Sequence, residues 1–546
     1  MKRERVPVLI VGGGPIGLAT GLALGRFGAP TILVERNPGT TDHPKARGTT
    51  ARTMEIFRLW GVEKAMRARA LGDTADVFGV GRSLFDLRPT HPEPVSDLTP
   101  AWKSYVAQDV VEEELFRALA RYPTTQVRFS TECIGFEQDQ DGVSARLVDR
   151  ATGAESEVRC DWLVAADGAG SRIRKHAGIG MSGIPALGYW TNEYIKVDLS
   201  DIPALKKIGI ALLAPPSAAE PWLALLNRDG TDRWLVVRRI GVAGDERDHT
   251  PSDAELAAEL RRRLGIDRPI EVVNISTWLS AREVAERYRK GRVFLAGDAA
   301  HRFLPTGGQG MNTGIADAQN LAWKLAFVIS GAMDPVILDS YDAERRPIGE
   351  ATADFQFRTG SRLAGLQARI DLDDEDNFGF WIDEADKHVR NIGLSLGHWY
   401  DQGLVVRDET TAPALDPERY TPVDRPGHRF PHLWVDERHN ESTLDWFDTA
   451  FVLVTGPDAE GWRAAAAELA REVAVPLQIK TIRAPDRERG IMIGKRGAVL
   501  VRPDGYVAWR CAWASKTPLE DLRGVFEKLG VRAPRRARAE APQAAE

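Results

Sequence analysis

The sequence predicts an α/β fold, on the strength of three observations in its first 300 residues. A glycine-rich segment from Gly12 to Gly17 lies between an apolar run and a helix-like stretch. The next apolar run ends at Glu35, and a later one, within residues 292–296, leads to Asp298. Apolar runs that alternate with helical periods are typical of a parallel sheet covered by helices. The 546 residues also exceed one core of about 250–300 residues, so we expect more than one domain.

The first glycine-rich segment predicts a Rossmann-like dinucleotide site. Gly12 and Gly14 permit a tight turn and a close backbone approach, and Gly17 lets the following helix pack against the strand. The start of that helix offers N–H groups and a positive dipole end to a diphosphate. Glu35 follows Gly12 by 23 residues, where a carboxylate suits ribose hydroxyls rather than a 2′-phosphate. The alternative is a glycine-rich turn in an unrelated α/β fold. The neighbouring residues of the predicted site are Pro15 and Arg36.

Two later segments extend this prediction from a dinucleotide to FAD. Asp167 opens an Asp-Gly segment after an apolar run, and Asp298 stands at the end of a buried strand. In an open α/β sheet, side chains at the carboxyl ends of strands point into the ligand crevice. Asp298 is therefore suited to hold the hydroxyls of a ribityl chain. Three such segments in this order predict one FAD site.

A glycine-rich loop at 307–308 opens a helix that includes Gly310, Met311 and Asn312. Apolar residues recur in it at helical spacing, so one face is buried and the N-terminal end can point at the ring. Backbone N–H groups there would stabilise negative charge on a reduced flavin. The alternative is a glycine-rich loop that enters an ordinary core helix.

The pattern of the remaining chain predicts its domains. Between residues 194 and 240 it becomes β-rich, which favours an antiparallel sheet inserted into the nucleotide domain. Beyond about residue 400 the order of strands and helices resembles a thioredoxin fold that lacks the redox CxxC pair, so support or dimerisation is expected of it. The expected domains are FAD-binding at 1–180 and 280–360, a substrate-binding sheet at 181–279, a helical linker at 361–400, a thioredoxin-like domain at 401–532 and a disordered tail at 533–546.

Composition excludes several classes of protein. The chain has three cysteines without CxxC spacing, Cys133, Cys160 and Cys511, so we expect neither a disulfide framework nor a zinc site. This use of cysteine favours a protein of the reducing cytoplasm. The net charge is −6 with dispersed basic residues, which does not suggest a nucleic-acid partner. No stretch approaches the roughly 20 apolar residues of a membrane span.

These motifs together resemble the group A flavoprotein aromatic hydroxylases, with the fold of para-hydroxybenzoate hydroxylase. The segments GDAAH at 297–301 and PTGGQGMNTGIADAQNLAWKL at 305–325 carry the resemblance, which extends over nearly the whole chain and is closest to chlorophenol and polyketide-tailoring hydroxylases. It implies a phenolic or similarly electron-rich substrate, a flavin C4a-hydroperoxide, O2, and NADPH or NADH as a transient reductant. It also implies cofactor contacts for Arg47 and Gln108, which could instead be a surface cation and a helix N-terminal residue.

Two residues are candidates for catalysis. His301 could relay protons near the flavin, although a hydrogen-bonded structural histidine is an equal alternative. Pro305 could shape the loop over the ring through its backbone. Phenol hydroxylase carries an acidic residue in the segment around Arg47, and this chain does not, so no catalytic aspartate is transferred.

The predicted substrate contacts lie in the β-rich region, where aromatic walls suit a small planar ligand. Ordinary sheet packing is the alternative for the tryptophans. The predicted contacts are Trp222, Leu225, Asn227 and Trp234.

Two other functions stay open at this point. One is a Baeyer–Villiger or oxidatively decarboxylating monooxygenase on the same scaffold, and the other is a catalytically silent protein that binds FAD and a ligand. The sequence also leaves open whether the chain forms a homodimer.

Overall fold

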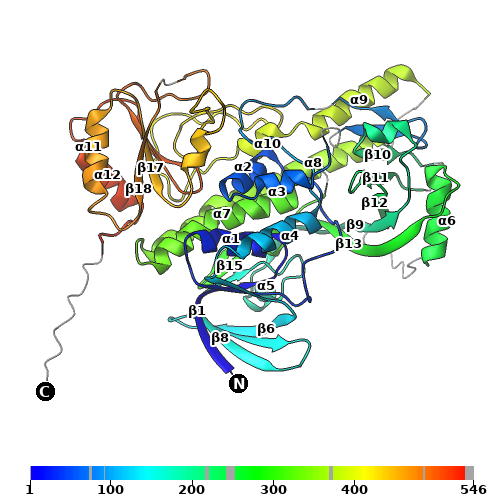
Figure 1. Cartoon of the computed structure of the whole chain (residues 1–546), viewed down its shortest axis with the longest axis horizontal. Helices are drawn as coiled ribbons and strands as arrows, with labels where there is room; N and C mark the ends of the chain where they lie inside the picture. The colour runs from blue at the N-terminus through cyan, green and yellow to red at the C-terminus, as the bar shows by residue number, and fades with distance from the viewer. Residues whose placement is uncertain are drawn as a thin grey trace. The chain divides into compact units, whose positions relative to one another are not determined.

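The computed structural model describes residues 2–72, 77–91, 93–215, 220–241, 252–305, 307–367, 373–483 and 486–534. The chain forms two compact units (Figure 1). Unit 1 comprises Met1–Ala322, Tyr341–His398 and Pro413–Thr421, and unit 2 comprises Trp323–Ser340, Trp399–Ala412 and Pro422–Glu546. The tail expected at 533–546 lies outside the described residues from 535 onward.

The first sheet of unit 1 has the strand order β14-β15-β8-β1-β2-β5. Outside this order, β7 pairs with β8, and β6 pairs with β7. The five strands from β15 to β5 are parallel. Their apolar runs are buried on both faces, as in Leu9 and Ile10, because helices cover a parallel sheet. The strands are β1 Lys2–Val11, β2 Thr31–Val34, β5 Thr125–Arg128, β6 Thr131–Gln138, β7 Val143–Asp149, β8 Glu155–Ala165, β14 Arg289–Lys290 and β15 Val293–Leu295.

Helices α1 and α5 of this sheet begin at the points where the first glycine segment and the Asp-Gly segment end. Helix α1 follows β1 directly and packs against α4, and α5 follows β8. The helices are α1 Pro15–Arg26, α2 Ala51–Leu59, α3 Glu63–Ala68, α4 Gln108–Leu119, α5 Arg172–His176 and α7 Gln309–Ile329, with a short 3-10 turn, η2, at Gly297–Ala299. This α/β arrangement is the predicted one.

The second sheet has the order β16-β13-β9-β12-β11-β10-β3-β4, and α6 (Asp253–Leu264) covers one of its faces. It is not confined to 181–279, because β3 and β4 come from the 78–89 segment and β13 continues past residue 279. It is also not wholly antiparallel, since β10 and β3 pair in parallel. The strands are β3 Phe78–Gly81, β4 Arg88–Pro89, β9 Met181–Lys196, β10 Ile210–Leu213, β11 Leu223–Asn227, β12 Arg233–Gly241, β13 Glu271–Ala285 and β16 His301–Arg302, and β9 is followed by the 3-10 turn η1, Pro203–Lys206.

Helices α8 (Ser340–Gln367), α9 (Glu375–Val389) and α10 (Ile392–Leu396) occupy most of the segment expected to be a linker at 361–400. They are not a linker, because α9 packs through Phe378 and Trp381 against the second sheet within unit 1. The burial of these two large side chains makes α9 part of the body of unit 1.

Unit 2 contains a four-stranded sheet of order β18-β17-β19-β20. The β17 and β18 strands are parallel, and the other two pairs are antiparallel. The elements are the 3-10 turns η3 Pro335–Asp339 and η4 Thr443–Trp446, strands β17 Phe451–Thr455, β18 Leu477–Thr481, β19 Ala498–Val501 and β20 Val507–Cys511, and helices α11 Glu460–Leu469 and α12 Pro518–Lys528. All three cysteines of the chain are free thiols.

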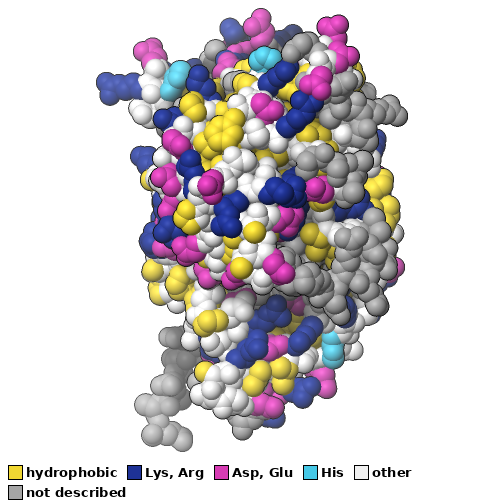
Figure 2. Space-filling view, turned by 90° about the vertical axis from the view of Figure 1, so that its right-hand side faces the viewer, with side chains coloured by type: hydrophobic (Ala, Val, Ile, Leu, Met, Phe, Trp, Pro, Cys, Tyr) yellow, Lys and Arg dark blue, Asp and Glu magenta, His cyan; other side chains and the backbone are white. Residues whose placement is uncertain are grey.

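The surface of the chain mixes both signs of charge. On the face shown in Figure 2, Lys and Arg side chains are interspersed with Asp and Glu. No helix in the described ranges combines the length and the hydrophobicity that crossing a bilayer requires. Within those ranges, too, His, Cys, Asp and Glu side chains form no group that could hold a metal ion.

Candidate cofactor and substrate site

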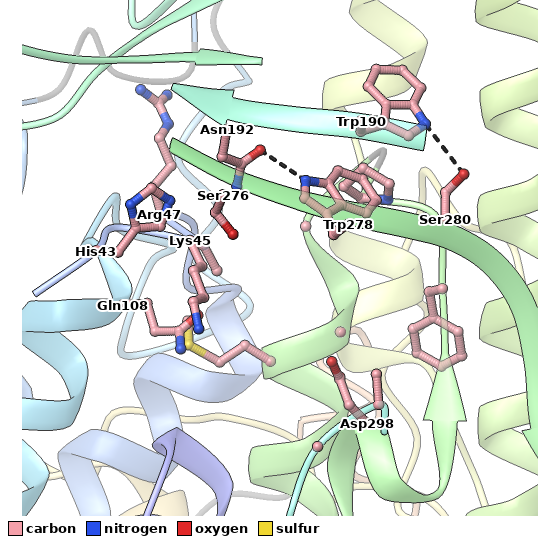
Figure 3. A pocket seen from close by; sticks show the side chains of 18 of the residues that line it. His43, Lys45, Arg47, Gln108, Trp190, Asn192, Ser276, Trp278, Ser280 and Asp298 are labelled. Atoms are coloured by element: carbon pink, nitrogen blue, oxygen red, sulfur yellow. Dashed lines mark hydrogen bonds between the residues drawn. The ribbon is translucent and has the colours of Figure 1, made fainter. Parts of the chain in front are cut away.

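A cavity of about 2140 Å³ lies within unit 1, between the carboxyl ends of the first sheet and one face of the second. Ligand pockets usually have volumes of roughly 300–1,000 Å³, so this cavity has room for more than one ligand. Figure 3 shows Asp298 on one side of it and Trp190, Asn192 and Trp278 on strands across from it. The predicted residues that line it are Gly12, Gly14, Pro15, Glu35, Arg36, Arg47, Gln108, Asp167, Trp222, Asp298, Pro305, Gly310, Met311 and Asn312.

The three glycines of the first motif have different roles. Gly12 has φ +109°, and a Cβ there would lie 2.3 Å from the Ala166 carbonyl oxygen. A Cβ on Gly17 would lie 1.8 Å from the Gly12 carbonyl oxygen, so this position is closed by the protein itself. At Gly14, by contrast, a Cβ would meet no protein atom within 4 Å. Gly14 therefore keeps a space open on the cavity wall, at the N-terminus of α1.

Glu35 and Gln108 hold the loops beside this helix end. The Glu35 carboxylate accepts hydrogen bonds from the backbone N–H groups of Gly13 (2.6 Å) and Asn37 (2.8 Å). Gln108 begins α4 and donates from Nε2 to Glu112 at 2.8 Å. Both line the cavity, and Arg36 is exposed beside them. Each carboxylate oxygen of Glu35 keeps a second lone pair that can accept a hydroxyl.

Asp167 caps α5. Its carboxylate accepts from the Ser171 hydroxyl at 2.5 Å and from the Ile173 N–H at 3.2 Å. Burial raises its pKa, although these hydrogen bonds oppose the shift. Asp167 thus fixes the turn after β8 at the cavity edge and is already partnered by the protein.

Asp298 differs from the other acidic residues of the site. It lies on η2, just beyond β15, and its side chain is accessible because it faces the cavity (Figure 3). No other described residue forms a hydrogen bond with its carboxylate. The carboxylate nevertheless lies deep in the protein, and this burial raises its pKa, against the smaller opposing effects of His301, Arg302 and Lys45. An acceptor in this state is suited to the hydroxyls of a bound ligand.

Helix α7 begins next to Asp298, after two glycines with positive φ, Gly307 at +82° and Gly308 at +64°. Asn312 accepts from the Thr50 N–H at 2.9 Å and donates to the carbonyls of Gly48 (3.0 Å) and Gly308 (2.7 Å). It therefore ties the 48–50 segment to the start of α7. Gly310, Met311 and Pro305 line the cavity beside it.

Arg47 lines the cavity but directs its guanidinium to the second sheet. It donates to the carbonyls of Gly209 (2.6 Å) and Asn227 (3.0 Å), and its Cζ lies 4.9 Å from the centroid of the Tyr105 ring. It is buried, so it is not the surface cation that the sequence allowed. A cofactor contact for Arg47 stays a prediction.

His301 does not line the cavity. Its ring is fully buried, stacks on Phe303 at 4.6 Å, and shares a 2.9 Å hydrogen bond between Nε2 and Asp317. Asp317 also accepts from Arg345 at 2.7 Å, and these charges keep its pKa low despite its burial. The structural alternative for His301 is therefore supported, and the proton relay is not.

Replacing His301 by asparagine tests this assignment. We expect the free energy of unfolding to fall by about 1–3 kcal/mol, because Asp317 loses a buried partner. FAD affinity and turnover should change by less than about twofold, since the ring does not reach the cavity. Denaturant unfolding and steady-state kinetics measure the two effects. A stable variant with abolished turnover would contradict the assignment.

The predicted substrate contacts divide between the two faces of the second sheet. Trp222 immediately precedes β11, lines the cavity, and stacks on Trp381 with ring centroids 6.3 Å apart. Leu225 and Trp234 are wrong as substrate contacts, because they lie on the opposite face in the core against α6. Asn227 pairs with Trp234 on that same face and accepts from the Gly230 N–H at 2.7 Å. Side chains alternate along a strand, so choosing the wrong face misplaced all three.

The cavity face of the sheet instead carries residues that the sequence analysis did not single out. Trp190 and Asn192 of β9 pair in register with Trp278 and Ser276 of β13, and all four line the cavity. The alternation of side chains along β9 predicts that Trp190 and Asn192 share one face of the sheet, but it does not predict which face lines the cavity. His43 and Lys45 also line the cavity, and burial lowers the pKa of His43.

Comparison with known protein families agrees with this geometry. A family model described as an FAD binding domain matches residues 5–356. A second model, described as the C-terminal part of aromatic-ring hydroxylases, matches residues 423–529. The tetracenomycin A2 monooxygenase-dioxygenase of Streptomyces glaucescens is 35% identical over 573 residues, which cover 97% of each chain.

Two solved structures resemble the whole chain. The flavin-dependent monooxygenase PieE, in complex with FAD and substrate, is 32% identical with a TM-score of 0.87, covering 96% of this chain and 99% of that one. Aklavinone-11 hydroxylase, in a ternary complex with FAD and aklavinone, is 33% identical with a TM-score of 0.84, covering 97% of this chain and 100% of that one.

Proposed function

Because the chain belongs to the family of FAD-dependent aromatic-ring hydroxylases, we propose that it adds a hydroxyl group to a phenolic or comparably electron-rich ring. It is a FAD-dependent monooxygenase of aromatic substrates. The observation that carries the finer proposal is one cavity with two unlike walls. The Asp298 carboxylate, which no other described residue hydrogen-bonds, and the α1 and α7 helix ends form one wall, and the Trp190 and Trp278 rings form part of the other.

The residues of the first wall fit FAD. The open space at Gly14 and the N-terminus of α1 suit a diphosphate, because N–H groups and the helix dipole favour an anion there. Glu35 suits the ribose hydroxyls, and Asp298 suits the hydroxyls of the ribityl chain. Each assignment uses a group that retains hydrogen-bonding capacity toward the cavity.

Bound FAD supplies the redox chemistry, in which NAD(P)H provides two electrons, one atom of O2 enters an aromatic C–H bond and the other leaves as water. The protein supplies position, exclusion of water and charge stabilisation. The N-terminus of α7 would stabilise negative charge on a bound flavin through its dipole. The apolar and aromatic face of the second sheet keeps water from the reacting atoms.

A direct experiment separates this proposal from its alternatives. We expect the purified chain to take up FAD and to consume NADH or NADPH faster when a phenol is present. With ¹⁸O2, the product mass should rise by one labelled oxygen while ring connectivity is retained. A ring-expanded or decarboxylated product would indicate the alternative monooxygenase reactions. FAD and ligand binding without stimulated consumption of NAD(P)H would indicate a catalytically silent protein.

For unit 2 we propose a thioredoxin-like fold with a structural role. A parallel pair, β17 and β18, flanked by antiparallel β19 and β20 with helices α11 and α12, supports that fold. Only Cys511 lies in this unit, so it has no dithiol with which to form a redox pair. We therefore propose a supporting role for unit 2 rather than a thiol redox activity.

A further inference from the structure

The cavity face of the second sheet carries a pair of polar side chains beside two tryptophans. Asn192 and Ser276 are register partners on β9 and β13, so their Cβ atoms lie roughly 4.5–5.5 Å apart. The neighbouring register pair is Trp190 and Trp278, whose rings stack at 5.8 Å with an interplanar angle of 13°. All four side chains line the cavity, and Figure 3 shows them on adjacent strands above Asp298.

The orientation of the Asn192 amide is determined by Trp278. The indole N–H of Trp278 donates to Asn192 Oδ1 at 3.0 Å. An indole N–H can only donate, so the amide oxygen must face it and the NH₂ group must face away. Among the described residues that NH₂ group has no hydrogen-bond acceptor, although Asn192 is only 7% exposed. A donor on a cavity wall that has no acceptor from the protein is available to an acceptor atom of a bound ligand.

The polar groups of Trp190 and Ser280, on the same wall, form hydrogen bonds within the sheet. The Trp190 indole N–H donates to Ser280 at 3.2 Å, and the Ser280 hydroxyl donates to the Gly188 carbonyl at 3.0 Å. Both indole edges are therefore used within the sheet, which leaves the ring faces as an apolar surface. The Ser276 hydroxyl, next to Asn192, forms no hydrogen bond within the described part of the chain. Beside the two tryptophans, Asn192 and Ser276 therefore keep hydrogen-bonding capacity toward the cavity.

We propose that the Asn192 NH₂ group, assisted by the Ser276 hydroxyl, binds an acceptor oxygen of the aromatic substrate, either a carbonyl or a phenolate. Trp278 is the positioning residue that fixes the amide for this task. The inference rests on the proposed function, because it assigns the second wall of the cavity to the substrate. It makes Asn192 a specificity-determining residue, since a site built to donate discriminates against a ring that offers no acceptor.

The test uses the FAD-loaded enzyme without NAD(P)H and measures binding by calorimetry. The probes are 2-hydroxy-1,4-naphthoquinone, which offers acceptor oxygens, and 2-methylnaphthalene, which has two rings and no oxygen. Asn192→Asp keeps the acceptor for Trp278 and the shape, but replaces the donor by a negative charge. We expect it to weaken binding of the quinone by roughly tenfold or more, and to leave binding of the hydrocarbon within about twofold.

Three further variants complete the experiment. Gln126→Glu makes the same amide-to-carboxylate change on the exposed face of β5, away from the cavity, and should bind both probes like the wild type. Ser276→Ala should weaken quinone binding by less than Asn192→Asp does. Trp278→Phe keeps an aromatic ring but frees the amide to rotate, so it should weaken quinone binding in the wild type and add little in the Asn192→Asp background.

The outcomes separate this inference from the proposed function. Unchanged quinone binding in Asn192→Asp, equal loss for both probes, or no quinone binding by the wild type would overturn the role of Asn192. A loss of FAD from Asn192→Asp with probe binding retained would place this wall against the cofactor and would also overturn it. Failure of the wild type to bind FAD or to hydroxylate any ring would instead refute the proposed function.

Discussion

Replacing Asp298 by alanine is expected to weaken FAD binding by roughly 10- to 100-fold and to abolish hydroxylation, while the protein still folds. The carboxylate faces the cavity and forms no hydrogen bond with another described residue, so we assign the hydroxyls of the cofactor as its partners. Hydrogen bonds to a charged group are worth about 1.5–3 kcal/mol, which corresponds to this range of affinity. FAD titration of the apoprotein measures the effect. Stoichiometric yellow protein with normal turnover would refute the assignment.

In the apoprotein, Asp298→Ala is expected to raise the free energy of unfolding, although it weakens FAD binding. Burial raises the pKa of Asp298, so the folded apoprotein binds a proton more tightly than the unfolded chain does. The free energy of unfolding therefore falls as the pH rises from the pKa of Asp298 in the unfolded chain to its higher pKa in the folded protein. Because the side chain is accessible to solvent in the cavity, removing it should stabilise the apoprotein only slightly at pH 7 relative to the wild type, with a smaller difference near pH 3.

Denaturant unfolding of apoprotein at the two pH values measures this difference. The matched control is Asp141→Asn, on the exposed β6–β7 turn, for which we expect no change in FAD affinity. Asp298→Asn keeps the shape and removes only the charge, so it should lie between the wild type and Asp298→Ala in FAD affinity. An apoprotein destabilised by both changes at position 298 would show that the carboxylate has a structural partner.

Replacing Gly14 by valine is expected to reduce FAD affinity by roughly 100-fold or more, with at most about 1 kcal/mol of apoprotein stability lost because valine is a poorer N-cap of α1 than glycine. A Cβ at this position meets no protein atom within 4 Å, and its extended backbone (φ −70°, ψ −173°) suits a β-branched residue. The added side chain would occupy the space assigned to the diphosphate. Apoprotein unfolding and FAD titration, measured on the same sample, check both parts.

Gly17→Ala is the matched contrast. Its Cβ would lie 1.8 Å from the Gly12 carbonyl oxygen, so the helix and the turn must shift. We expect the apoprotein to lose about 1–3 kcal/mol of stability, as overpacked sites do, and to lose FAD as a consequence. Unaltered FAD affinity in Gly14→Val, or equal destabilisation by both changes, would argue against the placement of the diphosphate.

Sequence reasoning was most successful where function depends on local backbone geometry. The glycine turn, Glu35 and Asp298 are each defined by a strand end and the residues beside it. The carboxyl ends of parallel strands meet at one edge of a sheet, so motifs far apart along the chain could be assigned to one cavity. The structure places all of them on the wall of that cavity.

Sequence reasoning failed where the answer depended on which face of an element is covered. Alternation along β11 and β12 separates two sets of side chains, but the packing of α6 decides that Leu225 and Trp234 belong to the core. His301 lies three residues from Asp298, yet the partner that holds it, Asp317, comes from a later turn of α7. Its burial in that contact could not be read from the motif.

The sequence by itself therefore determined the α/β class, the FAD-binding motifs and the family, because these are properties of short segments whose backbone needs particular residues. Only the tertiary structure decided which side chains line the cavity wall that we assign to the substrate. It joined β3 and β4 to the second sheet, closed one sheet face with α6, and turned Asn192 toward the cavity through Trp278. Such choices follow from packing between distant segments, and packing is a property of the whole fold.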